Sequence, residues 1–340
     1  MQNKQIIFTA PGVAELLDNE IKAPGAGEVL VETVYSTISA GTERANLAGD
    51  PNVSTSRRSV GRPVTFPRTL GYCSSAIVRE VGEGVTKVKP GDRVAVSWGK
   101  HSRYQVRGEV DIHPLPEGIT MRDAALGLIA TFPMAAIRKC RLEMGESAIV
   151  MGQGILGQLA VQLLRAAGAV PVIAADPVEA KREMALALGA DYALDPFADD
   201  FADRVRAITG GGVKVAIEVT GNGKALDLVL DCMARFGRVA LLGCTRDSNF
   251  TIDYYRKVHG PGITMVGAHT MARPSHESSP GWWTTADDMQ AVFALAAGGR
   301  IRLESMVEET HSPAEATEIY ARLMREKAFP VVQFDWGLIK

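Results

Sequence analysis

The hexapeptide GQGILG at residues 152–157 has glycines at the spacing GxGxxG. It follows an apolar stretch typical of a buried strand and opens a helical pattern that runs to Ala167. In such a turn the first glycine permits a tight reversal, the second lets the backbone approach a pyrophosphate, and the third lets the helix pack on the strand. Amides at the helix start donate to phosphate oxygens. The pattern therefore predicts a dinucleotide-binding loop, although a glycine-rich turn that binds nothing is the alternative. The predicted contacts are Gly152, Gly154, Ile155, Leu156 and Gly157.

An acidic residue ends the next predicted strand, Val170–Ala175. Asp176 lies at about 20 residues from the loop, which is the distance at which this motif places a carboxylate on the adenosine ribose. A carboxylate there accepts hydrogen bonds from both ribose hydroxyls and repels a 2′-phosphate. The sequence therefore favours NAD over NADP as the cofactor.

The chain shows two patterns of predicted secondary structure, one rich in short strands and one in which strands alternate with helices. Up to about residue 120, short predicted strands are broken by glycine and proline, as in a β-barrel or sandwich. From about residue 146, apolar strands alternate with helices, which predicts a parallel sheet covered on both faces. The tail mixes both kinds of element, and we expect it to rejoin the first domain. The fold class is thus α/β with two domains. The strands expected in the first part are Gln5–Thr9, Glu28–Ser36, Ser75–Glu80, Arg93–Ser97 and Tyr104–Val106; the later helices include Val178–Leu188, Lys224–Arg235 and Thr284–Ala297.

The composition excludes several classes of protein. The 340 residues are 46% hydrophobic and carry 37 basic against 39 acidic side chains, for a net charge of −2. This balance gives no bulk attraction to nucleic acid or to an anionic membrane. No apolar run reaches the ~18 residues of a membrane span, and the four cysteines are too scattered for a disulfide framework or a thiolate zinc site. We expect a cytoplasmic protein that acts on a small molecule, with neither nucleic acid nor membrane as partner.

Three motifs together resemble one family. GVTKVKPGDRVAV at residues 84–96, the glycine loop, and ALGADYALD at residues 187–195 resemble the medium-chain dehydrogenase/reductase superfamily, whose best-known members are zinc-type alcohol and polyol dehydrogenases. The resemblance implies a GroES-like β-barrel catalytic domain at residues 1–125 and 272–340, and a Rossmann doubly wound parallel sheet at residues 126–271. It also implies a cleft between the domains for nicotinamide and substrate, and a homodimer or homotetramer formed through the last Rossmann strand, Ile263–Gly267.

The metal ligands of the zinc-type members are missing. By resemblance, the catalytic ligands fall at Ala40, at Tyr72 and near Gly127, and the segment after Val96 has no cysteine for a structural zinc. We therefore predict no metal at either place. The segment Ser39–Arg44 is similar to a zinc-lacking branch that includes bacteriochlorophyllide dehydrogenase.

Three side chains remain at the position of the missing metal. The Tyr72 phenol offers a group that donates or accepts the proton of a substrate oxygen. By resemblance, Thr42 matches a hydroxyl that opens a proton relay, and Glu43 matches a carboxylate behind the metal that could orient Tyr72 or act as a base. The alternatives are that Tyr72 only fills the vacated volume and that Glu43 forms a salt bridge within the barrel, for example to Arg44 or Arg68.

The resemblance also implies further cofactor contacts. Thr131 matches the threonine beside the nicotinamide, and Lys181 matches a basic residue near the adenosine ribose. Thr220, Leu242 and Gly243 match the ends of later Rossmann strands, which wrap the dinucleotide.

Two loops carry residues that are harder to interpret. The segment 50–68 contains Arg57, Arg58, Arg62 and Arg68, which either bind an anionic group of the substrate or form a solvated basic loop. We expect His269 to lie near the nicotinamide or at a subunit interface, unless its role is structural. The segment 271–283, with His276 and the pair Trp282-Trp283, lines a substrate cleft or packs on a neighbouring subunit.

These residues predict a zinc-independent NAD(H) oxidoreductase that interconverts a secondary alcohol and a ketone on a sugar, polyol or sugar acid. Tyr72, with Thr42 and Glu43, would move the proton. One alternative is reduction of an activated C=C bond with NAD(P)H, as in quinone and enoyl reductases of the same superfamily. The other is a dinucleotide-binding protein without catalytic activity.

Overall fold

A computed structural model describes residues 1–54 and 62–339. The chain forms two compact units, one made of residues 1–129 with the tail from Leu303, and the other of Ala130–Arg302.

The first unit is built on a mostly antiparallel sheet. Its described residues form a seven-stranded sheet in the order β14-β15-β3-β4-β5-β7, with β6 also paired to β3. The tail belongs to this sheet, because β15 pairs antiparallel with β3 so that Phe334 lies opposite Ser36. The strands are β3 (Glu28–Thr37), β4 (Cys73–Val81), β5 (Arg93–Ser97), β6 (Tyr104–Gly108), β7 (Ile112–Pro114), β14 (Glu309–His311) and β15 (Val332–Asp335).

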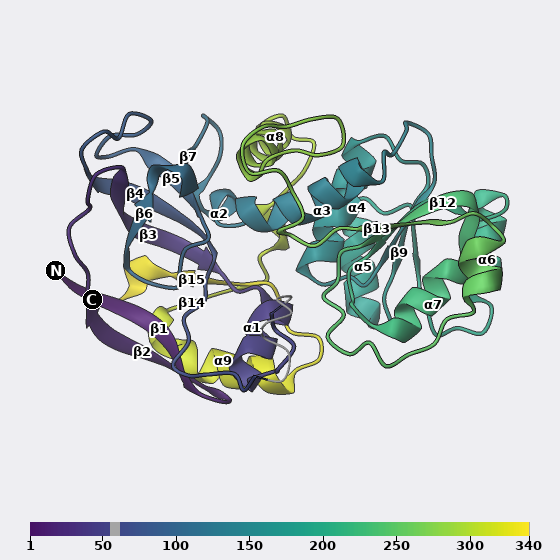
Figure 1. Ribbon diagram of the computed structural model, residues 1–340, viewed down its shortest axis with the longest axis horizontal. Helices are drawn as coiled ribbons and strands as arrows, with labels where there is room; N and C mark the ends of the chain where they lie inside the picture. The colour runs from purple at the N-terminus through teal and green to yellow at the C-terminus, as the bar shows by residue number, and fades with distance from the viewer. Residues whose placement is uncertain (55–61, 340) are drawn as a thin grey trace. The chain divides into compact units, whose positions relative to one another are not determined.

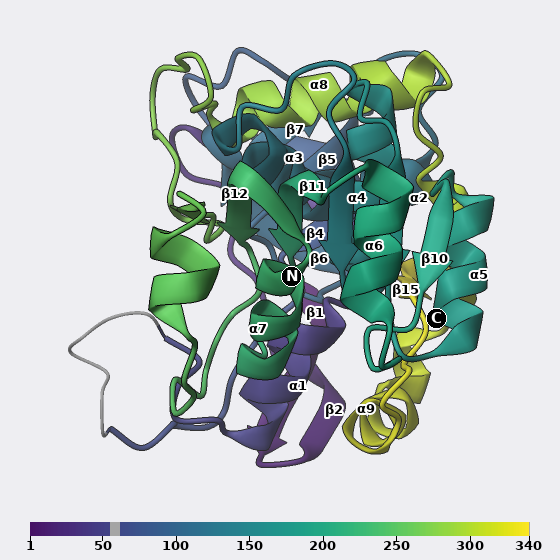
Figure 2. The ribbon, with the colours of Figure 1, turned by 90° about the vertical axis from the view of Figure 1, so that its right-hand side faces the viewer.

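A hairpin and two helices complete the apolar core of this unit. Strands β1 (Gln2–Ala10) and β2 (Val13–Glu20) form the hairpin, and helices α1 (Ala40–Ala48) and α9 (Ala316–Arg325) lie beside it (Figure 2). The core between them contains Phe8, Tyr320 and Phe334, each at most 1% exposed. The short helix α2 (Met121–Ala124) also belongs to this unit, and α3 (Gly127–Lys139) crosses the boundary between the units.

The second unit is a parallel sheet with helices on both faces. Its six strands have the order β10-β9-β8-β11-β12-β13, and every pair is parallel. Helices α4 and α5 lie on one face, and α6 and α7 on the other (Figure 1). Sequence and structure therefore agree on an α/β fold that combines a GroES-like domain with a doubly wound sheet. The elements are β8 (Ala148–Met151), α4 (Ile155–Ala166), β9 (Val172–Ala175), α5 (Glu179–Ala187), β10 (Tyr192–Leu194), α6 (Phe201–Thr209), β11 (Val213–Glu218), α7 (Gly223–Asp231), β12 (Met233–Leu241), β13 (Thr264–Gly267) and α8 (Thr285–Ala297).

The strand register brings the loops of interest to one edge. Met151 lies opposite Ala175 on one side and Glu218 on the other, and Glu218 lies opposite Leu241. These residues all end their strands or lie one position from the end, so the segments that follow them share the carboxyl edge of the sheet. In open α/β sheets this edge is where ligands bind.

The domain boundary expected at residue 272 stays a prediction. The compact units divide the chain elsewhere: the tail of the first unit begins at Leu303, and α8 is held in the second unit by a 2.9 Å bond from Arg138 to Asp288. One expected helix end needs correction. The helix expected to end at Arg235 ends at Asp231, since the strand β12 already begins at Met233.

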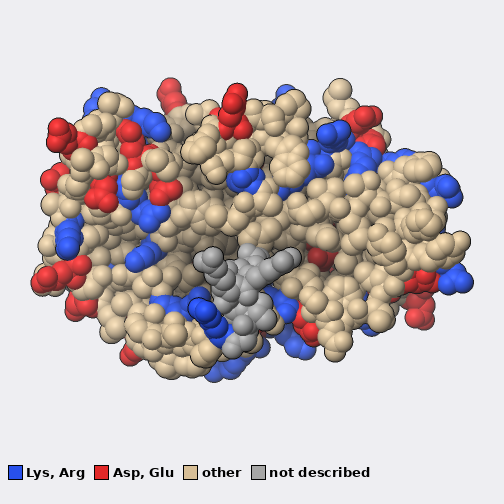
Figure 3. Space-filling view, in the orientation of Figure 1, with Lys and Arg blue, Asp and Glu red and all other residues tan. Residues whose placement is uncertain are grey.

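Charges of both signs lie on the surface. Acidic and basic side chains are interspersed on the face shown in Figure 3. Within the described residues, no helix is long and apolar enough to cross a membrane.

Candidate active site

The glycine loop between β8 and α4 has the shape that binds a pyrophosphate. Gly152 has a φ of 97°, in the left-handed region that favours glycine. A Cβ on Gly157 would lie 1.9 Å from the carbonyl oxygen of Gly152, so only glycine lets the helix approach the loop. A Cβ on Gly154, in contrast, would meet nothing within 4 Å. The space beside Gly154 is therefore open, and the first amides of α4, those of Ile155 and Leu156, follow this residue.

Asp176 lies beside this loop, as the sequence predicts. Its Oδ2 accepts a 2.7 Å hydrogen bond from the Gln153 amide, and its Oδ1 accepts one of 2.8 Å from the Val178 amide. These bonds fix the carboxylate at the end of β9. Each carboxylate oxygen can accept more than one hydrogen bond, so the ribose hydroxyls of a dinucleotide still find acceptors.

The segment after β11 lies against the glycine loop. The methyl group of Thr220 is 2.7 Å from where a Cβ on Gly152 would be, and a Cβ on Gly243 would lie 2.1 Å from the Gly221 amide nitrogen. The amides of Leu242 and Gly243 both donate to the Glu218 carbonyl, at 2.9 and 2.8 Å. The structure thus brings Thr220, Leu242 and Gly243 to the same edge as the loop.

Glu218, which sequence reasoning missed, organises this segment. Its buried carboxylate accepts bonds from the Thr220 amide at 2.7 Å and the Gly221 amide at 3.2 Å, as well as from the Thr220 hydroxyl. Burial raises the pKa of Glu218, while these hydrogen bonds oppose the rise. A buried strand whose last residue is acidic, as in VKVAIE, is the signal that could have identified it.

The other two predicted cofactor residues lie on helices. Thr131 is buried in α3, where its carbonyl accepts a 3.1 Å bond from Arg273. Lys181 is 9% exposed on α5, and its place beside a ribose stays a prediction. The next residue, Arg182, was not predicted; its guanidinium donates to the Asp176 carbonyl at 2.8 Å.

In the first unit, three hydroxyl groups meet at the predicted proton-transfer site. The Tyr72 hydroxyl donates a short hydrogen bond to Ser39, and the Thr42 side chain also hydrogen-bonds to this phenol. Ser39 precedes α1, Thr42 lies in its first turn, and Tyr72 immediately precedes β4. The Tyr72 ring also packs on Trp98, with centroids 5.8 Å apart. Burial raises the pKa of Tyr72 well above its ordinary value, so the phenol holds its proton.

Glu43 is buried in a network behind these hydroxyls. Its carboxylate accepts bonds from Tyr320 at 2.5 Å, from His101 at 3.2 Å and from the Ser39 amide at 2.9 Å. The expected partners Arg44 and Arg68 are therefore wrong: the Arg44 guanidinium donates to the carbonyls of Leu323 and Glu326 instead. Glu43 is linked to Tyr72 through Ser39, and sequence reasoning assigned neither His101 nor Ser39 to this network.

The donors at this site do not suit a zinc ion. Zinc in proteins is held by thiolate, imidazole and carboxylate groups. The hydroxyls of Ser39, Thr42 and Tyr72 are poor substitutes, and Glu43 already accepts three hydrogen bonds. Cys73 is the nearest thiol; burial raises its pKa to about 12, which keeps it protonated. Among the described residues, no group of three or more His, Cys, Asp or Glu side chains could hold a metal.

The tryptophan pair packs on its own unit. The Arg138 guanidinium lies 3.6 Å from the centroid of the Trp283 ring, and the Lys139 ammonium 5.0 Å from that of Trp282. His269 accepts a 3.2 Å bond from the Met271 amide, and burial together with Lys139 lowers its pKa. His276 is exposed, and nothing in the structure gives it a functional partner.

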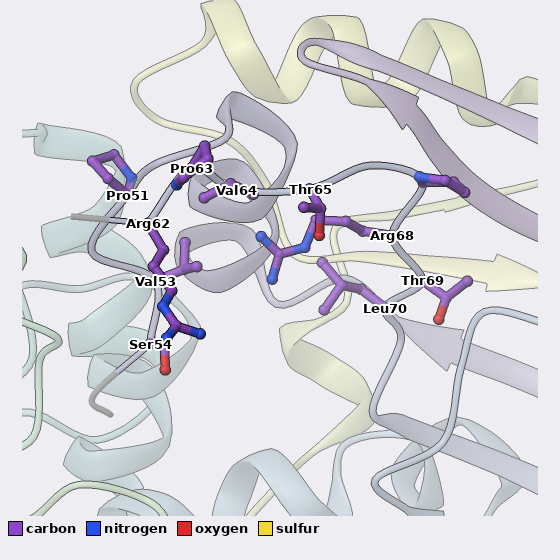
Figure 4. A pocket seen from close by; sticks show the side chains of 11 residues that line it. Pro51, Val53, Ser54, Arg62, Pro63, Val64, Thr65, Arg68, Thr69 and Leu70 are labelled. Carbon is purple, nitrogen blue, oxygen red and sulfur yellow. The ribbon is translucent and has the colours of Figure 1, made fainter. Parts of the chain in front are cut away.

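A pocket of about 520 Å³ is lined by residues of the arginine-containing segment 50–68 and the two residues that follow it, which together we call the basic loop (Figure 4). Arg62 and Arg68 line it, whereas the predicted Arg57 and Arg58 lie outside the described residues.

Comparison with known proteins agrees with this architecture. Residues 25–140 match the family described as alcohol dehydrogenase GroES-like domain, and residues 156–282 match the zinc-binding dehydrogenase family. The chain is 26% identical to D-guloside 3-dehydrogenase of Escherichia coli K12, over 93% of this chain and 95% of that protein. It is 27% identical to L-threonine 3-dehydrogenase of Pyrococcus horikoshii, over 94% of each. Benzyl alcohol dehydrogenase of Acinetobacter calcoaceticus has the same fold, with a TM-score of 0.84 at 19% identity over 98% of this chain and 99% of that one.

Proposed function

Because this chain belongs to the medium-chain dehydrogenase/reductase superfamily, we propose that it is a zinc-independent, NAD(H)-dependent oxidoreductase that interconverts a secondary alcohol and a ketone. The observation that carries this proposal is the meeting of the Tyr72, Ser39 and Thr42 hydroxyls, which form a hydrogen-bonded path for a proton. The names of the relatives, a guloside and a threonine dehydrogenase, favour a hydroxylated small molecule as substrate. We favour a sugar, polyol or sugar acid.

The glycine loop and Asp176 support NAD as the cofactor. The open space beside Gly154 accepts a pyrophosphate, and the Asp176 carboxylate accepts ribose hydroxyls but repels a 2′-phosphate. When bound, the nicotinamide supplies the acceptor or donor of a hydride at C4.

Tyr72 would supply the proton in ketone reduction. As the carbonyl oxygen becomes an alkoxide, a protonated phenol can donate to it, and the raised pKa keeps Tyr72 in that state. Ser39 and Thr42 would then stabilise the phenolate by hydrogen bonds until it takes up a proton from water. In alcohol oxidation the phenol would first have to lose its proton, which the raised pKa disfavours, so this site favours ketone reduction.

The first test is turnover of polyols, sugars, sugar acids, the corresponding ketones and enones with NAD⁺ or NADH, followed at the nicotinamide absorbance and repeated with the NADP forms. We expect Tyr72→Phe to lower kcat by a factor on the order of 10²–10⁴, since the ring stays but its proton is lost. Thr42→Ser is the matched control, because it keeps a hydroxyl. Near-normal turnover by Tyr72→Phe would show that this ring only fills space. Turnover of enones alone would favour C=C reduction, and NADH binding without turnover of any compound would favour a binding protein.

The pH profile gives a second prediction for the same group. Because the pKa of Tyr72 is raised, the protonated phenol persists as the pH increases through the ordinary tyrosine value of about 10. We expect kcat for ketone reduction to stay level from about pH 7 to pH 10, measured under saturating NADH. A fall in kcat with a midpoint clearly below pH 10 that is absent in Tyr72→Phe would contradict the raised pKa.

A further inference from the structure

The pocket of about 520 Å³ in the first unit is lined by residues from two stretches of the basic loop, 51–54 and 62–70. Its lining contains two arginines and no acidic residue. Both arginines come from the stretch 62–70, Arg62 at its start and Arg68 near its end (Figure 4). The lining residues are Pro51, Val53, Ser54, Arg62, Pro63, Val64, Thr65, Pro67, Arg68, Thr69 and Leu70.

Neither arginine has a counter-ion among the described residues. The ion pairs of this unit involve other arginines, such as Arg79 with Glu32 at 2.7 Å and Arg322 with Glu309 at 2.8 Å. Arg68 is only half-exposed, and its burial removes water from the guanidinium without supplying an acidic partner. A partly desolvated cation without a partner gains more from an anion than a fully hydrated one.

The wall that carries Arg68 is fixed to the core of the unit. The Arg68 amide and carbonyl both hydrogen-bond to Phe8 of β1, each at 2.8 Å. Phe66 and Leu70, on either side of Arg68, pack against the core cluster around Ile38 and Leu47. Arg68 is therefore held on a rigid segment, which lowers the entropy lost when it binds a ligand.

The same wall leads directly to Tyr72. Leu70 lines the pocket, and Tyr72 follows two residues later, at most about 7 Å along an extended chain. The link between them is fixed as well. The Leu70 carbonyl accepts a 2.6 Å bond from the His101 amide, and a Cβ on Gly71 would lie 2.1 Å from that same nitrogen. A molecule whose reacting hydroxyl is at Tyr72 can thus extend into the pocket.

We infer that this pocket binds an oxyanion, so that the substrate is a hydroxylated molecule with a carboxylate or phosphate group held by Arg68 and Arg62. Guanidinium groups bind both oxyanions through paired N–H donors, and the hydroxyls of Thr65 and Thr69 on the pocket wall are further donors. The inference rests on the proposed function only for the identity of the reacting group, because anion binding to the pocket needs no turnover.

The test measures anion binding to the full-length protein by calorimetry, at constant ionic strength, with inorganic phosphate in one arm and D-gluconate in the other. Saturating NADH is present in half of the titrations, to occupy the glycine loop. We expect at least one of the two anions to bind, and Arg68→Gln to weaken its binding about tenfold or more. The control is Arg325→Gln, which removes the same charge from an exposed site on α9, and should bind like the wild type.

The outcomes separate the two proposals. Binding of phosphate but not gluconate would identify a phosphate group on the substrate, and the reverse would identify a carboxylate. Equal binding by wild type and Arg68→Gln, or no binding of either anion, would overturn the anion site while leaving the dehydrogenase proposal intact. If neither the wild type nor either variant binds NADH, the proposed function is overturned instead. The titrations without NADH, in which Arg68→Gln is compared with Arg325→Gln, would still decide whether the anion site exists.

Discussion

Glu43 shows how a single buried carboxylate can hold a reactive group in place without touching it. His101 also bonds to Ser36 at 2.8 Å, and Ser36 accepts a 2.8 Å bond from the Trp336 indole. Since the Glu43 carboxylate can only accept, His101 donates to it, and the Ser36 hydroxyl, which accepts from the indole, can donate its own proton to the other ring nitrogen. Every polar group in this chain of contacts has a partner, and the chain ends at the Ser39 amide, next to the hydroxyl that meets Tyr72.

Removing this carboxylate should be costly. Glu43→Ala leaves the buried donors of Tyr320, His101 and Ser39 without an acceptor, and we expect a loss of about 3–5 kcal/mol in the free energy of unfolding. Urea unfolding followed by circular dichroism measures it. Glu318→Ala, which removes an exposed carboxylate from α9, is the control and should change stability by less than about 0.5 kcal/mol. Equal stability of the two variants would show that Glu43 is not held as described.

At the scale of elements, the turn from β8 into α4 separates a structural glycine from a functional one. Gly157 has no room for a side chain, because its Cβ would meet the Gly152 carbonyl oxygen at 1.9 Å. Gly154 has open space in front of it and a φ of −72°, which any residue adopts. The two glycines of one motif therefore serve different purposes.

Alanine at each position should reveal the difference. Gly157→Ala forces the helix away from the loop, and we expect a lower melting temperature. Gly154→Ala should keep the wild-type melting temperature without ligand but weaken NADH binding roughly 10- to 100-fold, since its methyl group occupies the space of the pyrophosphate. Thermal unfolding and fluorescence titration with NADH measure the two effects. Wild-type NADH affinity in Gly154→Ala would mean that no phosphate lies beside this residue.

Elements with a regular pattern of apolar residues could be predicted from the sequence, and elements without such a pattern could not. The apolar run of β9 and the helical spacing of apolar residues in α4 could be predicted, because both faces of the strand are buried and the helix buries every residue from Gly157 to Leu164. Helix α1 has the polar sequence AGTERANLA and buries Glu43 and Asn46, so no apolar stripe marks it. Strand β2 was missed for a similar reason, since most of its residues are partly exposed.

For the whole molecule, the limit on prediction is the pairing of distant residues. Tyr72, Thr42 and Glu43 were identified by their places in a motif, but their partners come from far along the chain. His101 is 58 residues from Glu43, and Tyr320 is 277 residues from it. Only the return of the tail to the first sheet brings Tyr320 to Glu43, and no local pattern records that contact. Sequence reasoning therefore assigned Tyr72, Thr42 and Glu43 to one site and missed the network of residues that positions them.

The residues of the whole chain also allow the zinc content of the protein to be predicted. A catalytic zinc needs three protein ligands, and the described residues contain no group of three or more ligand side chains. The internal segment that the structure leaves out, residues 55–61, has the sequence TSRRSVG and adds no His, Cys, Asp or Glu. We expect purified protein to hold far less than one zinc per chain by atomic emission, and a chelator to leave turnover unchanged, because in the proposed mechanism Tyr72 rather than a metal meets the charge on the substrate oxygen. One tightly bound zinc per chain, lost together with activity on chelation, would contradict the assignment of that role to Tyr72.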